Sequence, residues 1–272
     1  NYYLANEYNP SIIYCHHPEQ LLVNNRDIVR KILHTLIDRA EKKGFENTDK
    51  ILCNSEFTSK AIKRTFQRDS LILFPGVDID KFSFSNVEDN YILTVNRIMP
   101  GKNLEFAIDI INNITKSGKD IKLIIAGTKQ VGFEWYIQSL ENKIRKLKLE
   151  KFIEIKVDVP DTDLIELYKR CMIFLYTPIE EHFGIAPIEA MSCGKPVVAF
   201  SKGGPKETIL NEKTGYILED NITLWEEKII NLLEDEERRK NMGIMARERV
   251  VNNFSWNIFT NKLEKCLKEL SN

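Results

Sequence analysis

The amino-acid sequence predicts an α/β fold whose larger part is a Rossmann-like, doubly wound parallel sheet. From residue 91 onward, short apolar runs alternate with helix-like stretches, a pattern typical of parallel strands joined by helices. In one unit of this pattern, residues 172–200, two apolar runs enclose a loop and a helix that ends at Gly194. We expect strands at 91–97, 122–128, 152–159, 172–178, 196–200 and 214–218, and helices at 103–117, 134–148, 161–170, 186–193 and 205–210.

A shorter α/β pattern precedes residue 78. We expect strands at 11–15, 50–55 and 71–77, and a helix from Ser55 to about residue 68. Segment 27–43 has the periodicity of an amphipathic helix. Its basic face is expected to be solvated, and contact with anionic lipid headgroups is the alternative.

The C-terminal part reads as helices that cover the sheet. Residues 225–251 place apolar side chains at helical spacing among many charges. Ser255 then resembles the N-cap of a last helix that continues to about Leu270.

The composition indicates a globular protein and disfavours several other classes. Of 272 residues, 43% are hydrophobic and 29% are charged, and the net charge of −1 disfavours nucleic acid as a partner. Five scattered cysteines without a C-x-x-C pair suit reduced thiols in the cytoplasm, so we expect neither disulfides nor zinc. No apolar run reaches the ~20 residues that span a bilayer, so any membrane contact is expected to be peripheral, at the cytoplasmic face.

Two glutamates mark the candidate ligand site. Glu181 lies in the loop after the strand at 172–178, and Glu189 lies on the helix that follows. Ligands bind at the carboxyl edge of open parallel sheets, and free N–H groups at a helix start favour phosphate. A carboxylate there accepts hydrogen bonds from ligand hydroxyls, so the pair fits a sugar nucleotide. For two glutamates alone, a solvated loop and a helix surface would be the more probable interpretation.

Two cations and a glycine support the ligand interpretation. Arg97 and Lys102 lie in the loop after the strand at 91–97, where both could converge on a diphosphate. Gly127 follows the next strand and is expected to line the same cleft. Alone, the two cations would be read as exposed loop residues, whereas beside the glutamates they favour a phosphate site.

The histidines and a short acidic pair give a weaker signal. His16 and His17 follow the strand at 11–15, where a structural role at the strand end is the alternative to a functional one. Asp78 and Asp80 form a D-x-D pair, but they follow Pro75-Gly76-Val77, so a turn is favoured over a metal site. We expect no metal.

The stretches around the two glutamates resemble the donor-site signature of family 4 retaining glycosyltransferases, which have the GT-B fold. They are Glu181-His182-Phe183-Gly184-Ile185, Glu189-Ala190-Met191 and Gly194-Lys195-Pro196-Val197-Val198-Ala199. In the same order, the chain resembles the family's interdomain linker, diphosphate loop and second glycine turn at 75–78, 96–103 and 203–207. Within the family, Tyr14-Cys15-His16-His17-Pro18 and Leu175-Tyr176-Thr177-Pro178 are most similar to the mannosyltransferases of lipid-linked oligosaccharide assembly.

The resemblance implies an enzyme that transfers a hexose, with mannose from GDP-mannose first among the donors, to a glycan or lipid-linked acceptor. Arg97 and Lys102 would stabilise the departing diphosphate, and Glu189 would bind the donor ribose. The resemblance also implies sugar contacts for Glu181 and His16. It further implies that the backbone of Phe183, Gly184, Ile185 and Ala186 holds the sugar and phosphate of the donor. The donor is a co-substrate, and no further cofactor is expected.

The resemblance also implies a domain division. It gives a partial N-terminal acceptor domain at 1–77, a donor domain at 78–254, and a helix at 255–272 that packs back on the N-terminal domain. The sequence enters the family pattern partway through the first domain, so we expect an incomplete acceptor side. The alternatives are an enzyme that uses UDP-glucose or UDP-N-acetylglucosamine, a nucleotide-sugar-binding fragment or partner subunit without activity, and a nucleotide-sugar epimerase.

Overall fold

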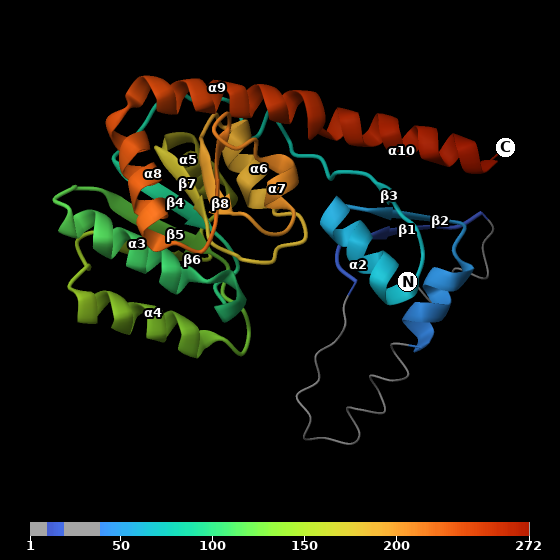
Figure 1. Ribbon diagram of the computed structural model, residues 1–272, viewed down its shortest axis with the longest axis horizontal. Helices are drawn as coiled ribbons and strands as arrows, with labels where there is room; N and C mark the ends of the chain where they lie inside the picture. Colours follow the sequence, from blue (N-terminus) through green and yellow to red (C-terminus); the bar gives the residue numbers. More distant parts are fainter. Residues whose placement is uncertain (1–9, 19–38, 272) are drawn as a thin grey trace, which may run out of the picture. The chain divides into compact units, whose positions relative to one another are not determined.

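The computed structural model describes residues 10–18 and 39–271, which belong to two α/β units (Figure 1). The smaller unit is Asn1–Pro75 with Asn257–Asn272, and the larger unit is Gly76–Trp256. Both units contain a parallel sheet, which confirms the predicted α/β class. Among the helices of the described residues, none is long and apolar enough to cross a membrane.

The smaller unit has a three-stranded parallel sheet in the order β1-β2-β3. These strands are β1 (Ile12–Cys15), β2 (Lys50–Cys53) and β3 (Leu71–Ile72). Apolar residues of α2 (Glu56–Phe66) pack with β1 and β2 in one core cluster. A second cluster joins Leu52 and Leu73 to side chains of α10 (Trp256–Ser271). The predicted helix start at Ser55 is confirmed, and Ser55 caps α2, because its hydroxyl accepts a hydrogen bond from the Thr58 N–H at 3.0 Å.

The third strand is shorter than the predicted run at 71–77. Its last ladder bond joins the Leu73 N–H to the Cys53 carbonyl at 2.8 Å, and Pro75 has no N–H with which to continue. Val77 instead donates to the carbonyl of Phe254 at 2.7 Å, within the larger unit. Most of the predicted helix at 27–43 lies outside the described residues. Its described end, from residue 39, belongs to a helix at 39–47.

The larger unit has a six-stranded parallel sheet in the order β6-β5-β4-β7-β8-β9. Every strand was predicted, with small differences at the ends: β4 (Tyr91–Val95), β5 (Lys122–Gly127), β6 (Ile153–Val157), β7 (Ile173–Tyr176), β8 (Val197–Phe200) and β9 (Gly215–Leu218). The first strand, β4, lies between β5 and β7, so the winding direction reverses there. Doubly wound sheets bind ligands at the carboxyl edge beside such a reversal.

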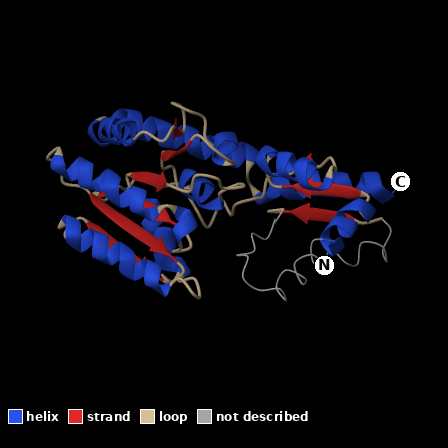
Figure 2. Cartoon of the chain, turned by 60° about the horizontal axis from the view of Figure 1, so that its bottom comes forward, coloured by secondary structure: helices blue, strands red, loops and turns tan. Residues whose placement is uncertain are grey.

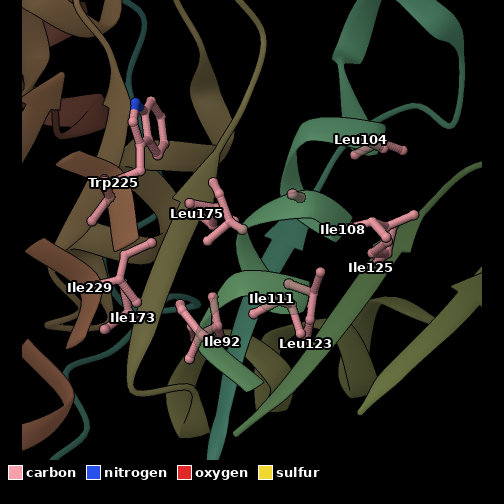
Figure 3. Close-up of a cluster of buried hydrophobic side chains, with 14 of the residues drawn as sticks. Ile92, Leu104, Ile108, Ile111, Leu123, Ile125, Ile173, Leu175, Trp225 and Ile229 are labelled. Atoms are coloured by element: carbon pink, nitrogen blue, oxygen red, sulfur yellow. The ribbon is translucent and has the colours of Figure 1, made fainter. Parts of the chain in front are cut away.

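Helices lie on both sides of the larger sheet (Figure 2). They are α3 (Leu104–Lys116), α4 (Glu134–Leu147), α5 (Asp161–Arg170), α6 (Ile185–Ser192), α7 (Pro205–Thr208), α8 (Ile222–Glu234) and α9 (Glu236–Asn253). Side chains from α3, α4 and α8 share one core cluster with Ile173 and Leu175 of β7. Figure 3 shows members of this cluster from α3, α8 and β7. Phe174 of the same strand points to the opposite face, where it stacks on Tyr168 of α5 with ring centroids 5.5 Å apart.

Residues 78–90, here called the strap, join the unit boundary to β4 and are fixed along the end of α6. The Ser192 hydroxyl donates to the Phe82 carbonyl at 2.7 Å, and the Ser85 N–H donates to the Cys193 carbonyl at 3.1 Å. Arg247 of α9 donates to the carbonyls of Ile79 and Phe82, both at 3.0 Å. The strap is therefore a bonded part of the larger unit.

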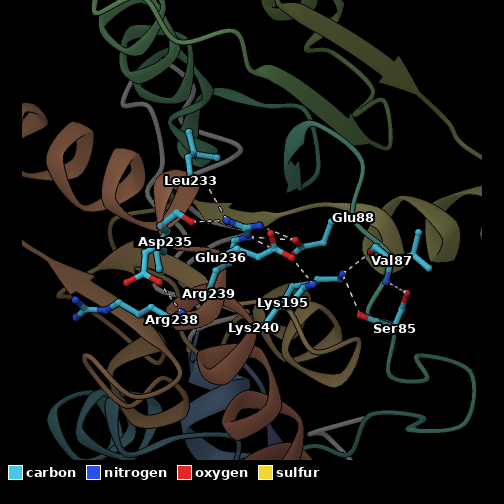
Figure 4. A network of polar contacts seen from close by, with 11 residues as sticks. Ser85, Val87, Glu88, Lys195, Leu233, Asp235, Glu236, Arg238, Arg239 and Lys240 are labelled. Carbon is cyan, nitrogen blue, oxygen red and sulfur yellow. Dashed lines mark hydrogen bonds and ion pairs between the residues drawn. The ribbon is translucent and has the colours of Figure 1, made fainter.

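Buried charges complete the attachment of the strap (Figure 4). The Lys195 ammonium donates to the carbonyls of Ser85 at 3.1 Å and Val87 at 2.9 Å. The Arg239 guanidinium donates Nη2 to Glu88 at 2.7 Å and Nη1 to the carbonyl of Leu232 at 2.6 Å, near the end of α8. The side chain of Arg239 is only 4% exposed and that of Glu88 is 14% exposed, so the pair is shielded from water.

Candidate active site

A cavity of about 340 Å³ opens at the carboxyl edge of the larger sheet, beside the reversal at β4. Its walls come from the segments that follow β4, β5, β6 and β7 and from the start of α6. Charged residues from these segments line it together: Arg97, Lys102, Glu181 and Glu189. Two cations and two carboxylates thus meet in one site, as the sequence pattern predicts.

The loop after β4 carries the two cations. Its short 3₁₀ turn at Pro100–Lys102 ends at Asn103, which adopts a left-handed conformation with φ of 53°. The carbonyl of Lys102 accepts a hydrogen bond from the Thr177 hydroxyl at 2.9 Å, which ties the loop to the end of β7. Gly127 lies against the same loop, because a Cβ at this position would be 1.7 Å from the Asn96 carbonyl oxygen. A glycine is required there for the two loops to meet.

Glu181 lies within reach of both a cation and a phenol. The Lys102 ammonium donates to Glu181 Oε2 at 2.5 Å, and the Tyr176 hydroxyl donates to the same oxygen at 3.2 Å. The side chains of Lys102 and Glu181 are 14% and 23% exposed, so water screens their attraction only weakly. Burial, followed by the charge of Glu181, raises the pKa of Tyr176 well above its usual value, so the phenol remains a donor.

The backbone of the Glu181 loop is held by the glycine turn that precedes α7. The Gly204 N–H donates to the Glu181 carbonyl at 2.8 Å. A Cβ at Gly203, where φ is +73°, would be 2.3 Å from that carbonyl oxygen. This turn therefore positions the loop that carries Glu181 by close backbone contact.

Glu189 lies on α6 and is largely buried. It accepts a hydrogen bond from the Tyr168 hydroxyl at 2.7 Å. Burial raises the pKa of the Glu189 carboxyl, while the Tyr168 hydrogen bond and the nearby Lys81 ammonium lower it. α6 begins after Gly184, whose φ is +82°, and no side chain caps its first N–H groups, which have no partner within the helix.

The structure brings most of the predicted site residues together. Lining the cavity are Arg97, Lys102, Gly127, Glu181, Gly184, Ile185, Ala186 and Glu189. Phe183 does not line it, because its ring is buried and packs edge-on against Phe254, with centroids 6.3 Å apart. His16 belongs to the smaller unit, where its side chain is exposed after β1 and its carbonyl accepts from Asn54 at 2.9 Å.

The D-x-D pair forms a turn. One Asp78 oxygen accepts from the N–H groups of Asp80 at 3.1 Å and Lys81 at 2.9 Å, which is a local cap of the kind that aspartate makes. Within residues 10–18 and 39–271, no group of three or more His, Cys, Asp or Glu side chains has the arrangement of a metal site.

The part of the chain that forms this cavity matches a known protein family. Residues 78–249 match the model of the family described as glycosyl transferases group 1, a span that contains the four charged residues of the site. The chain belongs to this family. It is a glycosyltransferase, as the motifs around Glu181 and Glu189 predict.

Curated relatives extend the similarity beyond the matched family domain. The alpha-1,3/1,6-mannosyltransferase ALG2 of Dictyostelium discoideum is 30% identical over 294 aligned residues, covering 95% of this chain and 70% of the relative. The human protein of the same name is 28% identical, covering 98% of this chain and 70% of the relative. The alignment of this glycosyltransferase with both relatives therefore includes the smaller unit.

Solved structures confirm the GT-B fold. HepE from Anabaena, solved in complex with UDP, superposes with a TM-score of 0.81 at 19% identity, covering 96% of this chain and 72% of HepE. Sucrose-phosphate synthase from Thermosynechococcus elongatus superposes with a TM-score of 0.80 at 20% identity, covering 95% of this chain and 67% of that protein.

Several residues that line the cavity of the glycosyltransferase are not predicted from its charged residues and glycines. Tyr176 is the last residue of a buried apolar strand, and its position at the carboxyl edge is the signal that could have identified it. Asn96 also lines the cavity, and it lies inside the stretch that resembles the diphosphate loop, where its uncharged amide gives no signal of its own. Val159 and Leu164 line the wall near β6 and α5, and no pattern in the sequence distinguishes them from core residues.

Proposed function

We propose that the protein transfers mannose from GDP-mannose to a hydroxyl of a glycan or lipid-linked acceptor, with retention of anomeric configuration. The observation that supports a sugar-nucleotide donor most directly is the convergence of Arg97, Lys102, Glu181 and Glu189 on one cavity. The names of the curated relatives, alpha-1,3/1,6-mannosyltransferases, favour mannose as the transferred sugar. A lipid-linked acceptor would bring the protein to the cytoplasmic face of a membrane as a peripheral protein.

In this proposal, the cations act on the leaving group. Negative charge develops on the diphosphate as the bond to the sugar breaks. Arg97, Lys102 and the N–H groups at the start of α6 stabilise this charge. The Lys102 ammonium has three donors, so it can hold Glu181 with one and a phosphate oxygen with another. Glu181 therefore keeps Lys102 directed into the cavity before the donor arrives.

The carboxylates act on hydroxyl groups. Glu189 accepts hydrogen bonds from the donor ribose, and Glu181 contacts the hydroxyls of the transferred sugar, both as acceptors that recognise a polyol. Because no side chain is assigned as a nucleophile, we infer a front-face reaction in which the departing phosphate accepts the proton of the acceptor hydroxyl. A sugar contact by His16 is part of this proposal only through the resemblance to family 4. Neither a metal nor a cofactor has a role in this proposal.

A transfer assay in EDTA tests the proposal. The chain is incubated with labelled GDP-mannose and lipid-linked glycan acceptors, and the product is digested with α-mannosidase. We expect label in the acceptor that α-mannosidase releases, since retention of the α-configured donor gives an α-linked product. UDP-glucose and UDP-N-acetylglucosamine are offered in parallel. Transfer from a UDP-sugar alone would replace the proposed donor, and donor binding without any transfer would indicate a non-catalytic fragment.

A further inference from the structure

Tyr168 lies near the C-terminal end of α5 and contacts Glu189, a residue of the cavity wall. Its side chain is fully buried, and its ring packs edge-on against Phe82 of the strap and stacks on Phe174 of β7, both at centroid distances of 5.5 Å. Its hydroxyl donates to Glu189 Oε2 at 2.7 Å. Three separate segments therefore fix the position of one phenolic oxygen next to the site.

The packing of the Tyr168 ring does not satisfy its hydroxyl group, which needs a hydrogen-bond partner. A buried phenol requires a hydrogen-bond partner, and Glu189 fills that role for Tyr168. Tyr168 itself does not line the cavity, whereas Glu189 does. Within the described part of the chain, no protein donor is bonded to the second carboxylate oxygen of Glu189.

We propose that Tyr168 is a positioning residue that holds the Glu189 carboxylate in one orientation, so that its other oxygen can accept hydrogen bonds from the donor ribose. This inference rests on the proposed role of Glu189 in donor binding. Tyr168 is not part of any motif around the site. Its effect on donor binding acts only through Glu189.

The surroundings of Glu189 make its ionisation sensitive to this hydrogen bond. α5 presents Tyr168 and Asp161, the strap presents Lys81, and α6 itself places the Cys193 thiol near its end. Burial raises the pKa of Glu189, and the charge of Asp161 raises it further, while Tyr168 and Lys81 lower it. Without the phenol, the pKa rises, so a larger fraction of Glu189 is protonated as the pH falls.

The test is calorimetric titration of the full chain with GDP-mannose between about pH 5.5 and pH 8.5. Each phosphate of this donor has only one strongly acidic group, so the charge of the donor stays constant over the range. For Tyr168→Phe we expect an affinity below that of wild type at the acidic end, by at most tenfold for each unit by which the pKa of Glu189 rises, and a smaller difference at the basic end.

Two further variants separate positioning from general damage. Tyr91→Phe is the matched control, because Tyr91 is also buried and donates to α5, at the Leu167 carbonyl at 2.8 Å, but lies outside the cavity. It should leave the pH profile of donor affinity unchanged. In Glu189→Gln the profile should flatten, and adding Tyr168→Phe to this variant should cause no further loss.

Each contrary result has a definite meaning. If the wild type binds GDP-mannose and Glu189→Gln weakens binding, but Tyr168→Phe has a wild-type profile, the positioning role is wrong and the proposed function stands. Equal losses from Tyr168→Phe with and without Glu189→Gln would also overturn the positioning role. Failure of the wild type to bind, or no effect of Glu189→Gln, would overturn both the proposed donor site and this inference.

Discussion

Replacing Glu88 by alanine should destabilise the larger unit strongly. The substitution leaves the Arg239 guanidinium buried without its carboxylate, while the bonds to the Leu232 and Leu233 carbonyls remain. Removing one partner of a buried ion pair costs about 3–5 kcal/mol of the free energy of unfolding. With an m-value of about 2 kcal/mol/M in urea, the unfolding midpoint should fall by about 2 M.

Tryptophan fluorescence is the suitable assay, because all three tryptophans belong to the larger unit: Trp135, Trp225 and Trp256. The control is Glu236→Ala, one turn from Arg239 on α9, where the pair with Lys240 is exposed and should contribute less than about 1 kcal/mol. A double variant, Glu88→Ala with Arg239→Met, should recover part of the loss, since no charge is left buried. A midpoint for Glu88→Ala equal to that of Glu236→Ala would refute the reasoning.

Three other substitutions or reactions have defined outcomes. Gly127→Ala should abolish donor binding in calorimetry, because its Cβ would displace the Asn96 carbonyl in the loop that carries Arg97; near-native affinity would contradict this contact. Lys102→Met should lower kcat of transfer about 10²- to 10³-fold, as loss of a charge-stabilising donor does, and an unchanged kcat would exclude the leaving-group role. Burial raises the pKa of Cys15 and Cys193 to about 12, so their thiolate fraction at pH 8 is far below that of a free thiol, and mass spectrometry should find iodoacetamide labelling only after unfolding in urea.

The fold of the larger unit was predictable because its strands are buried on both faces. Parallel strands covered by helices appear in the sequence as continuous apolar runs, as at 173–176 and 197–200, and turn residues mark their ends. Helix α5 was also predicted correctly, since its predicted bounds at 161–170 are those of the structure. Three charged residues of the site were predictable for a related reason: Arg97, Lys102 and Glu181 lie in loops that follow such strands, and the carboxyl ends of parallel strands meet at one edge. Glu189 lies on the helix after one of these loops.

The remaining features depend on contacts between distant parts of the chain. A lysine after a helix end is normally solvated, yet Lys195 is buried because strap carbonyls more than a hundred residues away accept its hydrogen bonds. Nothing local predicts that residues 78–90 are bonded to α6 and α9 rather than forming a loose linker. The bond between Tyr168 and Glu189 likewise joins two helices separated by a strand, and its existence follows only from how α5 and α6 pack.

The central claim is that the cavity of the larger unit binds a nucleotide sugar through Arg97 and Glu189. Calorimetric titration in EDTA with GDP-mannose, GDP and UDP-glucose tests it most directly, with Arg97→Ala and Glu189→Ala as the variants. The account predicts that the GDP compounds bind without metal and that each substitution weakens them. Absence of binding by every nucleotide, or affinities that neither substitution alters, would contradict it.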